Sequence, residues 1–405
     1  MPGASVKTYG YRWVVLLAFM LINVTIQILW ICFAPITSEA AKFYGVSDLE
    51  IGLLAMVFMI IYIPFAFPAS WAIDRFGFAK AVGFGAILLG VFAILRGVFI
   101  RSFGLTMVST IGLAIAQPFL LNANTKVAAK WFALEERATA VALGLVASFL
   151  GIVLGQMLTP ALILSLGFEQ THLWYGVITA ASAAIFLVLV RENPPTPASP
   201  PEFEARALML DGLRSILRTR DFYVLAYVLF VGGGIFNGIS TFVESIVRPR
   251  GMSITQAGTL GGVMLIGGIV GAVLFSPISD KLRIRKLVIV AGLVLAVPSL
   301  LGVTLGPSYG VLLASFFALG LFTTGIGPVA YQYGAEITYP APEGTSNGLL
   351  VLAGQISVVF IYGMGLLSEW LGSFVTPLLI FAGLLALGCV FMGFAKESPM
   401  MKRAA

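Results

Sequence analysis

The sequence R-E-N-P-P-T-P-A-S-P-P-E-F-E, residues 191–204, opens a polar segment that runs to residue 221 and divides the chain. This segment carries five arginines and none of the long apolar runs found elsewhere. Proline-rich, polar composition of this kind is typical of a linker between domains. We interpret residues 191–221 as a cytoplasmic linker with a short amphipathic helix. It joins a bundle over residues 1–190 to a second bundle over 222–405.

The composition indicates that lipid is the solvent for both halves. Hydrophobic residues make up 59% of the chain and charged residues only 10%, whereas soluble domains carry roughly 25% charged residues. A helix needs about 20 apolar residues to cross the hydrocarbon core. We therefore predict an all-α membrane protein with twelve transmembrane helices, six on each side of the linker. The predicted spans are 12–36, 51–72, 80–99, 104–126, 138–165, 173–190, 222–247, 255–277, 287–306, 309–333, 347–371 and 373–395.

The basic residues indicate the orientation, because Lys and Arg in short loops are retained on the cytoplasmic side. With the N-terminus inside, 19 of the 24 basic residues fall in inner segments. Both termini are therefore predicted to be cytoplasmic, and the net charge of +6 requires no nucleic-acid partner. The first span is too long for a signal peptide and is expected to remain as a membrane helix.

An internal repeat relates the two halves at a constant offset of 206 residues. Two related six-helix bundles are the simplest interpretation. The matched residues are Gly45, Ser47, Gly52, Leu54, Val57, Ser70, Asp74 and Arg75 in the first half, and Gly251, Ser253, Gly258, Leu260, Val263, Ser276, Asp280 and Lys281 in the second.

The motif D-R-x-G at Asp74, Arg75 and Gly77 resembles the loop between the second and third helices of the major facilitator superfamily. In that family the acid caps a neighbouring helix and pairs with basic residues, which locks one conformation. The resemblance implies a gating role for these residues and for Asp280 and Lys281 in the second copy. A generic charged turn is the alternative for the motif alone. Twelve spans, a central linker and the repeat favour the superfamily fold, with two pseudo-symmetric bundles.

Polar and aromatic residues inside the first and seventh spans are candidates for a substrate pathway. Gln27 and Trp30 are three residues apart and share one helix face, and a polar face in hydrocarbon is expected to point inward. Phe236 is the repeat-mate of Trp30, and Asn237 lies beside it. A packed core aromatic and a structural amide are the alternatives for Trp30 and Asn237.

Three further spans carry polar residues that we expect to line the pathway. Gln355 is the only strongly polar side chain in the middle of the eleventh span, and such an amide must bind either a ligand or a neighbouring helix. Gln117 and Asn122 in the fourth span and Tyr331 in the tenth are the other candidates.

Charged residues constrain the substrate. A charge at the bilayer centre costs about 2.5–3.5 kcal/mol, and none is predicted there: Arg96 and Glu244 lie near span ends and are expected to snorkel to the interface. Without a buried cation, dicarboxylates and phosphate esters are disfavoured, which leaves neutral or cationic solutes. Glu244 is a possible coupling residue, although a facilitative carrier is preferred.

Metal and redox chemistry are not expected. Cys32 and Cys389 lie in separate spans at opposite ends of the chain and suggest neither a disulfide nor a metal site. His172 is the only histidine, predicted in a short outer loop, whereas haem would require axial ligands. No cofactor and no enzyme activity are predicted.

A more specific resemblance, to the feline leukaemia virus subgroup C receptor-related transporters, covers most of the chain. That family is described as transporting choline and ethanolamine, with a disputed assignment to haem export. The matching runs are the first helix around Trp30, F-Y-G-V-S at 43–47, M-V-F-M-I-I-Y-I-P-F-A-F-P-A-S-W at 56–71, A-Q-P-F at 116–119, K-W-F at 130–132, I-S-T at 239–241 and A-E-I-T-Y-P-A-P-E-G-T-S-N-G-L-L at 335–350.

By this resemblance the family's cage tryptophan falls on Trp30 and its eleventh-helix glutamine on Gln355. Aromatic faces bind a quaternary ammonium by cation–π attraction, at about 0.5–2 kcal/mol each. The family's fifth-helix glutamine is replaced by Phe149, and its seventh-helix tyrosine by Asn237.

These observations together predict a secondary transporter in the plasma membrane that works as a monomer by alternating access. Choline or an amino alcohol is the first expected substrate. The alternatives are a proton-coupled transporter of another small metabolite, a haem carrier, and a membrane receptor of the same fold that does not transport.

Overall fold

A computed structural model describes residues 9–133, 136–196, 216–339, 341 and 343–399, and these residues form helices without strands. Twelve helical spans in this part of the chain are long and apolar enough to cross a membrane, which confirms the predicted number. Helices are the expected solution for such a sequence because hydrocarbon offers no partner to backbone N–H and C=O groups. The predicted amphipathic linker helix lies outside the described residues.

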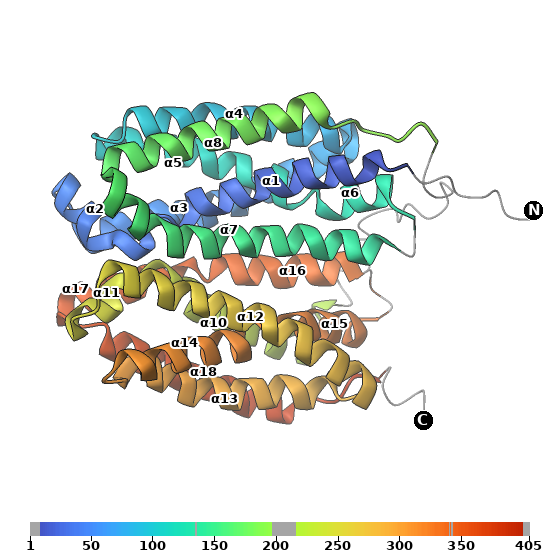
Figure 1. The fold of residues 1–405 in the computed structure, drawn as a ribbon. Helices are drawn as coiled ribbons and strands as arrows, with labels where there is room; N and C mark the ends of the chain where they lie inside the picture. Colours follow the sequence, from blue (N-terminus) through green and yellow to red (C-terminus); the bar gives the residue numbers. More distant parts are fainter. Residues whose placement is uncertain (1–8, 134–135, 197–215, 340, 342, 400–405) are drawn as a thin grey trace, which may run out of the picture. The chain divides into compact units, whose positions relative to one another are not determined.

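The chain forms two compact units (Figure 1). The first comprises Met1–Phe33, Glu39–Val46 and Val57–Ala205, and the second comprises the remaining residues. Two short segments of the first half, Ala34–Ser38 and Ser47–Met56, therefore belong to the second unit. The chain changes unit directly after Phe33.

Close glycine contacts pack the first unit. A Cβ on Gly176 would lie 2.6 Å from the carbonyl oxygen of Ala93, and Gly151 faces the carbonyl oxygen of Val24. Small residues let helices approach where lipid supplies no hydrophobic drive. The helices of the first half, of which α2 and α3 begin in the second unit, are α1 (Tyr11–Ile31), α2 (Thr37–Tyr44), α3 (Asp48–Phe76), α4 (Phe78–Val98), α5 (Phe103–Leu121), α6 (Asn124–Trp131), α7 (Arg137–Leu166) and α8 (Phe168–Leu189).

The second unit uses the same packing, with Gly267 and Gly271 of one helix against the backbone of Phe317 and Leu321 of another. Its elements are η1 (Ala34–Ile36), α10 (Arg220–Thr241), α11 (Val243–Val247), η4 (Arg248–Arg250), α12 (Ile254–Leu282), α13 (Arg285–Leu305), α14 (Tyr309–Thr323), α15 (Gly327–Ile337), α16 (Glu343–Ile356), α17 (Val358–Leu371) and α18 (Val375–Phe394).

The helix bounds repeat at the offset expected from the sequence. Helix α12 begins and ends 206 residues after α3, and α14 begins 206 residues after α5. At these helix ends the two halves thus correspond residue by residue.

Several spans are interrupted, whereas the sequence pattern predicted continuous helices. The first span is divided into α1, η1 and α2, and similar breaks separate α5 from α6, α10 from α11, α14 from α15 and α16 from α17. Irregular backbone at membrane depth is tolerated where protein groups or a cavity satisfy it. The breaks are therefore the places to look for functional side chains.

Candidate functional site

Trp30 and Gln27 lie in the last two turns of α1, and each is 7% exposed. Gln117 on α5 is 6% exposed, and its Nε2 donates a hydrogen bond to Oε1 of Gln27 at 3.0 Å. The structure therefore brings three of the predicted site residues into one region of the first unit. The amide pair leaves one donor group and one carbonyl group for further partners.

Phe149 lies half-buried on α7, two residues before a close contact with α1. A Cβ on Gly151 would lie 2.8 Å from Cβ of Gln27. This contact places α7 against the face of α1 that carries Gln27.

Asn122 is fully engaged in a hydrogen-bond network with α3. Its Oδ1 accepts from the Tyr62 hydroxyl at 2.6 Å, and its Nδ2 donates to the carbonyl of Ala66 at 3.2 Å and to Oγ of Ser70 at 3.0 Å. Because the amide already has three partners at the α5–α6 break, its geometry favours a structural role over ligand contact.

The remaining pathway candidates belong to the second unit. Phe236 and Asn237 on α10, Tyr331 on α15 and Gln355 on α16 are all half-buried. A Cβ on Gly233 of α10 would lie 3.6 Å from Cα of Gly354, so α10 and α16 are in contact one residue from Gln355.

The first loop motif is held by two interactions. The exposed Asp74 pairs with Nζ of Lys126 at 3.2 Å. The backbone N–H groups of Phe78 and Ala79 at the start of α4 donate to the Glu192 carboxylate at 3.2 and 2.7 Å. The carboxylate that caps α4 is therefore Glu192.

Gly77 is required where this cap forms. Its φ of +87° lies in the left-handed region, and a Cβ would approach the Glu192 carboxyl group to 2.5 Å. Arg75 is exposed. Gly77 therefore serves the turn and leaves room for the cap.

The second motif has the same plan with different side chains. Asp280 pairs with the buried Arg285, which also lies 3.2 Å from Oε1 of Glu336. The N–H of Lys286 donates to the Glu397 carboxylate at 3.1 Å, in the manner of Glu192 at α4. Lys281 is exposed and lies outside the ion pairs found among the described residues.

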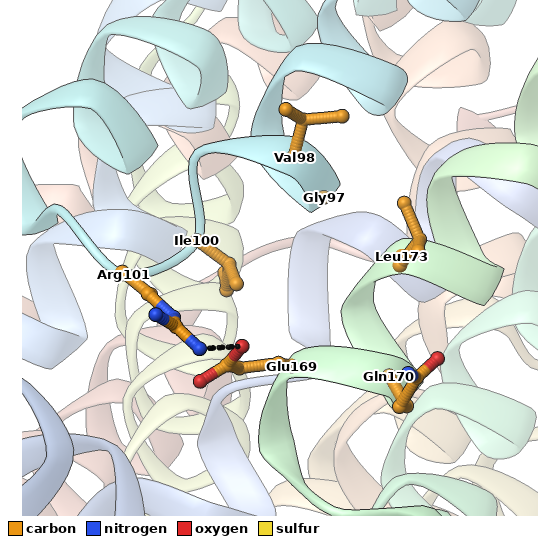
Figure 2. A pocket seen from close by; sticks show the side chains of 7 residues that line it. All are labelled: Gly97, Val98, Ile100, Arg101, Glu169, Gln170 and Leu173. Atoms are coloured by element: carbon orange, nitrogen blue, oxygen red, sulfur yellow. Dashed lines mark ion pairs between the residues drawn. The ribbon is translucent and has the colours of Figure 1, made fainter.

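A hollow of about 410 Å³ lies beside this second motif, lined by Ser276, Asp280, Arg285, Pro328, Val329 and Gln332. Another, of about 270 Å³, lies between the end of α4 and the start of α8 (Figure 2). There Arg101 and Glu169 point toward each other and pair at 2.9 Å, with both side chains well exposed. Neither hollow contains the predicted pathway residues.

Glu244 is buried rather than snorkelling, which corrects the expectation from its position near a span end. It is 2% exposed, and its carboxylate accepts from N of Ser38 at 3.0 Å and from Oγ of Ser38 at 2.8 Å. Arg248 lies 3.3 Å from the same carboxylate and 2.8 Å from that of Asp48. Burial raises the pKa of Glu244, against the opposing effects of Arg248 and Ser38.

Arg96 is also buried, at 2% exposure, and the predicted snorkelling is wrong for it too. Its Nη1 donates to the carbonyl of Leu29 at 2.9 Å, and its Nη2 donates to Sγ of Cys32 at 3.4 Å. Because the protein does contain a buried cation, anionic substrates are not disfavoured on that ground. Both buried guanidinium groups, Arg96 and Arg285, are nevertheless held by protein groups.

His172 lies inside α8 with 2% exposure, so its predicted place in a loop is wrong. Its ring stacks on Phe33 at 4.8 Å, and its Nδ1 lies 2.8 Å from the carbonyl oxygen of Phe168. Cys32 and Cys389 are free thiols. The described residues contain no group of His, Cys, Asp and Glu that could hold a metal ion.

The sequence interpretation missed four residues with clear structural roles: Ser38, Arg96, Glu192 and Glu397. A signal for two of them was present. Each half has a basic residue followed by Glu directly after its last span, Arg191 with Glu192 and Lys396 with Glu397. Such a repeated pair predicts a repeated cap.

Comparison with known proteins agrees with this architecture. The Major Facilitator Superfamily model matches residues 13–362 and 242–404. The feline choline/ethanolamine transporter FLVCR1 is 30% identical over 91% of this chain and 70% of its own length. Solute carrier family 49 member A3 of Xenopus tropicalis is 31% identical over 86% of this chain and 76% of its own length.

Solved structures support the fold alone. A bacterial homologue of the human lysosomal transporter Spinster aligns with a TM-score of 0.81 at 17% identity, covering 95% of this chain and 97% of its own. A D-xylose–proton symporter aligns with a TM-score of 0.72 at 16% identity, covering 96% and 99%. The chain belongs to the major facilitator superfamily, among the relatives of the FLVCR choline/ethanolamine transporters.

Proposed function

We propose that this protein is a facilitative carrier of choline or a related amino alcohol in the plasma membrane, with both termini cytoplasmic. The observation that carries the proposal is the buried Trp30 at the end of α1, with the Gln27–Gln117 amide pair one turn away. A tryptophan face suits a quaternary ammonium, and an amide suits the hydroxyl of the same solute.

The relatives support this substrate class, since several are named choline/ethanolamine transporters. Phe149 and Asn237 stand where that family has glutamine and tyrosine, so within the first unit the hydroxyl contact is assigned to the Gln27–Gln117 pair. Gln355 of the second unit remains a separate candidate. Phe236 and Tyr331 remain proposed substrate contacts of the second unit, whereas Asn122 is proposed to position α3 in the first unit.

We also propose that the carrier works by alternating access, as expected for its fold class. The residues proposed to gate its cytoplasmic side are Asp74, Arg75, Gly77, Asp280 and Lys281. Glu244 was a candidate coupling residue. Its hydrogen bonds to Ser38 and its ion pair with Arg248 favour a structural role, in which Glu244 holds these residues together, over a role in carrying protons. We therefore propose transport without a coupling ion, by a monomer.

The test is uptake of radiolabelled choline and ethanolamine into sealed proteoliposomes that contain the purified protein. Wild type is expected to equilibrate choline across the membrane, and Trp30→Ala is expected to lose about 1–2 kcal/mol of binding, or roughly 5–30-fold in affinity. Trp370→Ala is the matched control because Trp370 is 75% exposed.

Different failures have different meanings. Choline binding by calorimetry without any flux would indicate a receptor that does not transport. Accumulation above the external concentration only under a proton gradient would replace the facilitative proposal with proton coupling. No binding of either amino alcohol would remove the substrate assignment.

A further inference from the structure

Arg96 of α4 is a buried cation with partners gathered on one short segment. Its guanidinium group contacts the carbonyl of Leu29 at 2.9 Å, Sγ of Cys32 at 3.4 Å and the ring of Phe33, whose centre lies 5.5 Å from its central carbon. All three partners fall within five consecutive residues at the end of α1. The ion pairs found in the described part of the chain do not include Arg96.

Burying a charge without a carboxylate requires other compensation. The last carbonyl groups of a helix lack intrahelical partners, and the C-terminal end of a helix carries partial negative charge. Helix α1 has no basic residue in its own last turn. Arg96 supplies the missing cation from the neighbouring helix, and the face of Phe33 adds a cation–π contact.

The position of this contact along the chain gives it a functional consequence. Trp30 lies directly between Leu29 and Cys32, the two residues that bond to Arg96. The regular helix ends at Ile31, and the chain passes into the second unit directly after Phe33. Arg96 therefore fixes the last turn of α1 to α4 at the point where the chain leaves the first unit.

A second contact holds the same point from α8. The ring of His172 stacks on Phe33 at 4.8 Å with an interplanar angle of 21°. Phe33 is thus in contact with both Arg96 and His172, and it is 2% exposed. Two helices of the first unit, α4 and α8, therefore contact the end of α1.

We propose that Arg96 is the positioning residue for Trp30: it holds the C-terminal turn of α1 so that the indole keeps one orientation while the chain beyond Phe33 moves. This inference rests on the proposed role of Trp30 in binding the ammonium group. A structural role alone would make Arg96 matter for stability and leave the environment of Trp30 unchanged.

The experiment follows Trp30 and choline separately. For wild type, Arg96→Leu and Arg96→Lys, the emission of Trp30 is obtained as the difference between each protein and the same protein carrying Trp30→Phe. Its quenching by acrylamide and the Kd for choline by calorimetry are then measured. Arg101→Leu is the matched control, since it removes an exposed cation close in sequence to Arg96.

For Arg96→Leu we expect stronger quenching of Trp30 and a Kd for choline raised about tenfold or more, since small misplacements of a binding group are costly. Arg96→Lys is expected to restore part of both, because lysine keeps the charge but not the planar fork. Arg101→Leu is expected to match wild type. An unchanged Trp30 signal and unchanged Kd in folded Arg96→Leu overturn the inference.

Two further comparisons decide the role of Arg96 if the main variant does not fold or if wild type does not bind choline. If Arg96→Leu does not fold, Arg96→Lys and Phe33→Leu are compared instead, and Trp30 signals equal to wild type in both overturn the inference. If wild type does not bind choline, the proposed substrate fails, while the quenching of Trp30 still decides the role of Arg96.

Discussion

Replacing Glu244 tests whether its buried carboxylate holds Ser38 in the second unit. Glu244→Ala removes two acceptor contacts for Ser38, at 3.0 and 2.8 Å, and the 3.3 Å contact with Arg248. An unsatisfied buried donor costs about 1–3 kcal/mol. Ser38 is only half-buried and Arg248 retains Asp48, so we expect a total loss of about 2 kcal/mol, arising mainly at Ser38.

The assay is thermal unfolding of the purified protein in detergent, followed by intrinsic fluorescence. One kcal/mol corresponds to about 2–4 °C for a unit of 150–250 residues, so Glu244→Ala is expected to lower the midpoint by several degrees. Glu39→Gln is the control, because Glu39 is exposed beside Ser38. A midpoint for Glu244→Ala within the control's range would refute the reasoning.

The pH dependence of the same site has a definite sign. Burial raises the pKa of Glu244 in the folded protein above its ordinary value. The contribution of Glu244 to the free energy of unfolding is therefore fully present below the unfolded pKa of about 4.3. It is lost as pH rises through the raised pKa of the folded protein. Wild type should gain stability over Glu244→Gln as pH falls from about 8 to 5. A gap that widens toward the alkaline end would instead show that Arg248 and Ser38 outweigh burial.

Three further substitutions follow from the geometry. Gly77→Ala is expected to lose about 2 kcal/mol in unfolding measurements, from the left-handed φ of +87° and the clash with Glu192; wild-type stability would contradict the cap. Arg283→Gly should gain about 1 kcal/mol, since Arg283 has a φ of 56°, and a loss would mean that its side chain contributes more than the strain. Gln117→Leu is expected to cost about 1–2 kcal/mol by leaving the carbonyl of Gln27 unpaired; a double-mutant cycle with Gln27→Leu should show coupling, and additive losses would exclude the bond.

The twelve spans could be predicted because hydropathy reports on lipid over some twenty residues at a time. The repeat was equally accessible, and the bounds of α3 and α12 reproduce its offset of 206 residues. The breaks within spans could not be predicted in this way. The interruption after Ile31 coincides with Pro35, which lacks the N–H that would bond the carbonyl of Ile31. Hydropathy averaged over a span does not register a single proline.

The two snorkelling predictions failed for a related reason. Arg96 and Glu244 lie near span ends, where a long side chain ordinarily reaches water. Each is instead bound by polar groups from another segment, Leu29 in one case and Ser38 in the other. The candidate site could be predicted only in part. The spacing of Gln27 and Trp30 along one helix is visible in the sequence. The three hydrogen-bond partners of Asn122 could be identified only from the structure.

The two glutamate caps also order the biosynthesis of the protein. The N-terminus of α4 receives its carboxylate from a residue 114 positions later, and that of α13 from one 111 positions later. The sixth span is therefore synthesised before α4 can be capped, and the twelfth span before α13 can be capped. Each capping carboxylate is thus made after the last span of its own half, and a nascent chain that stops at residue 190 still lacks the cap of α4.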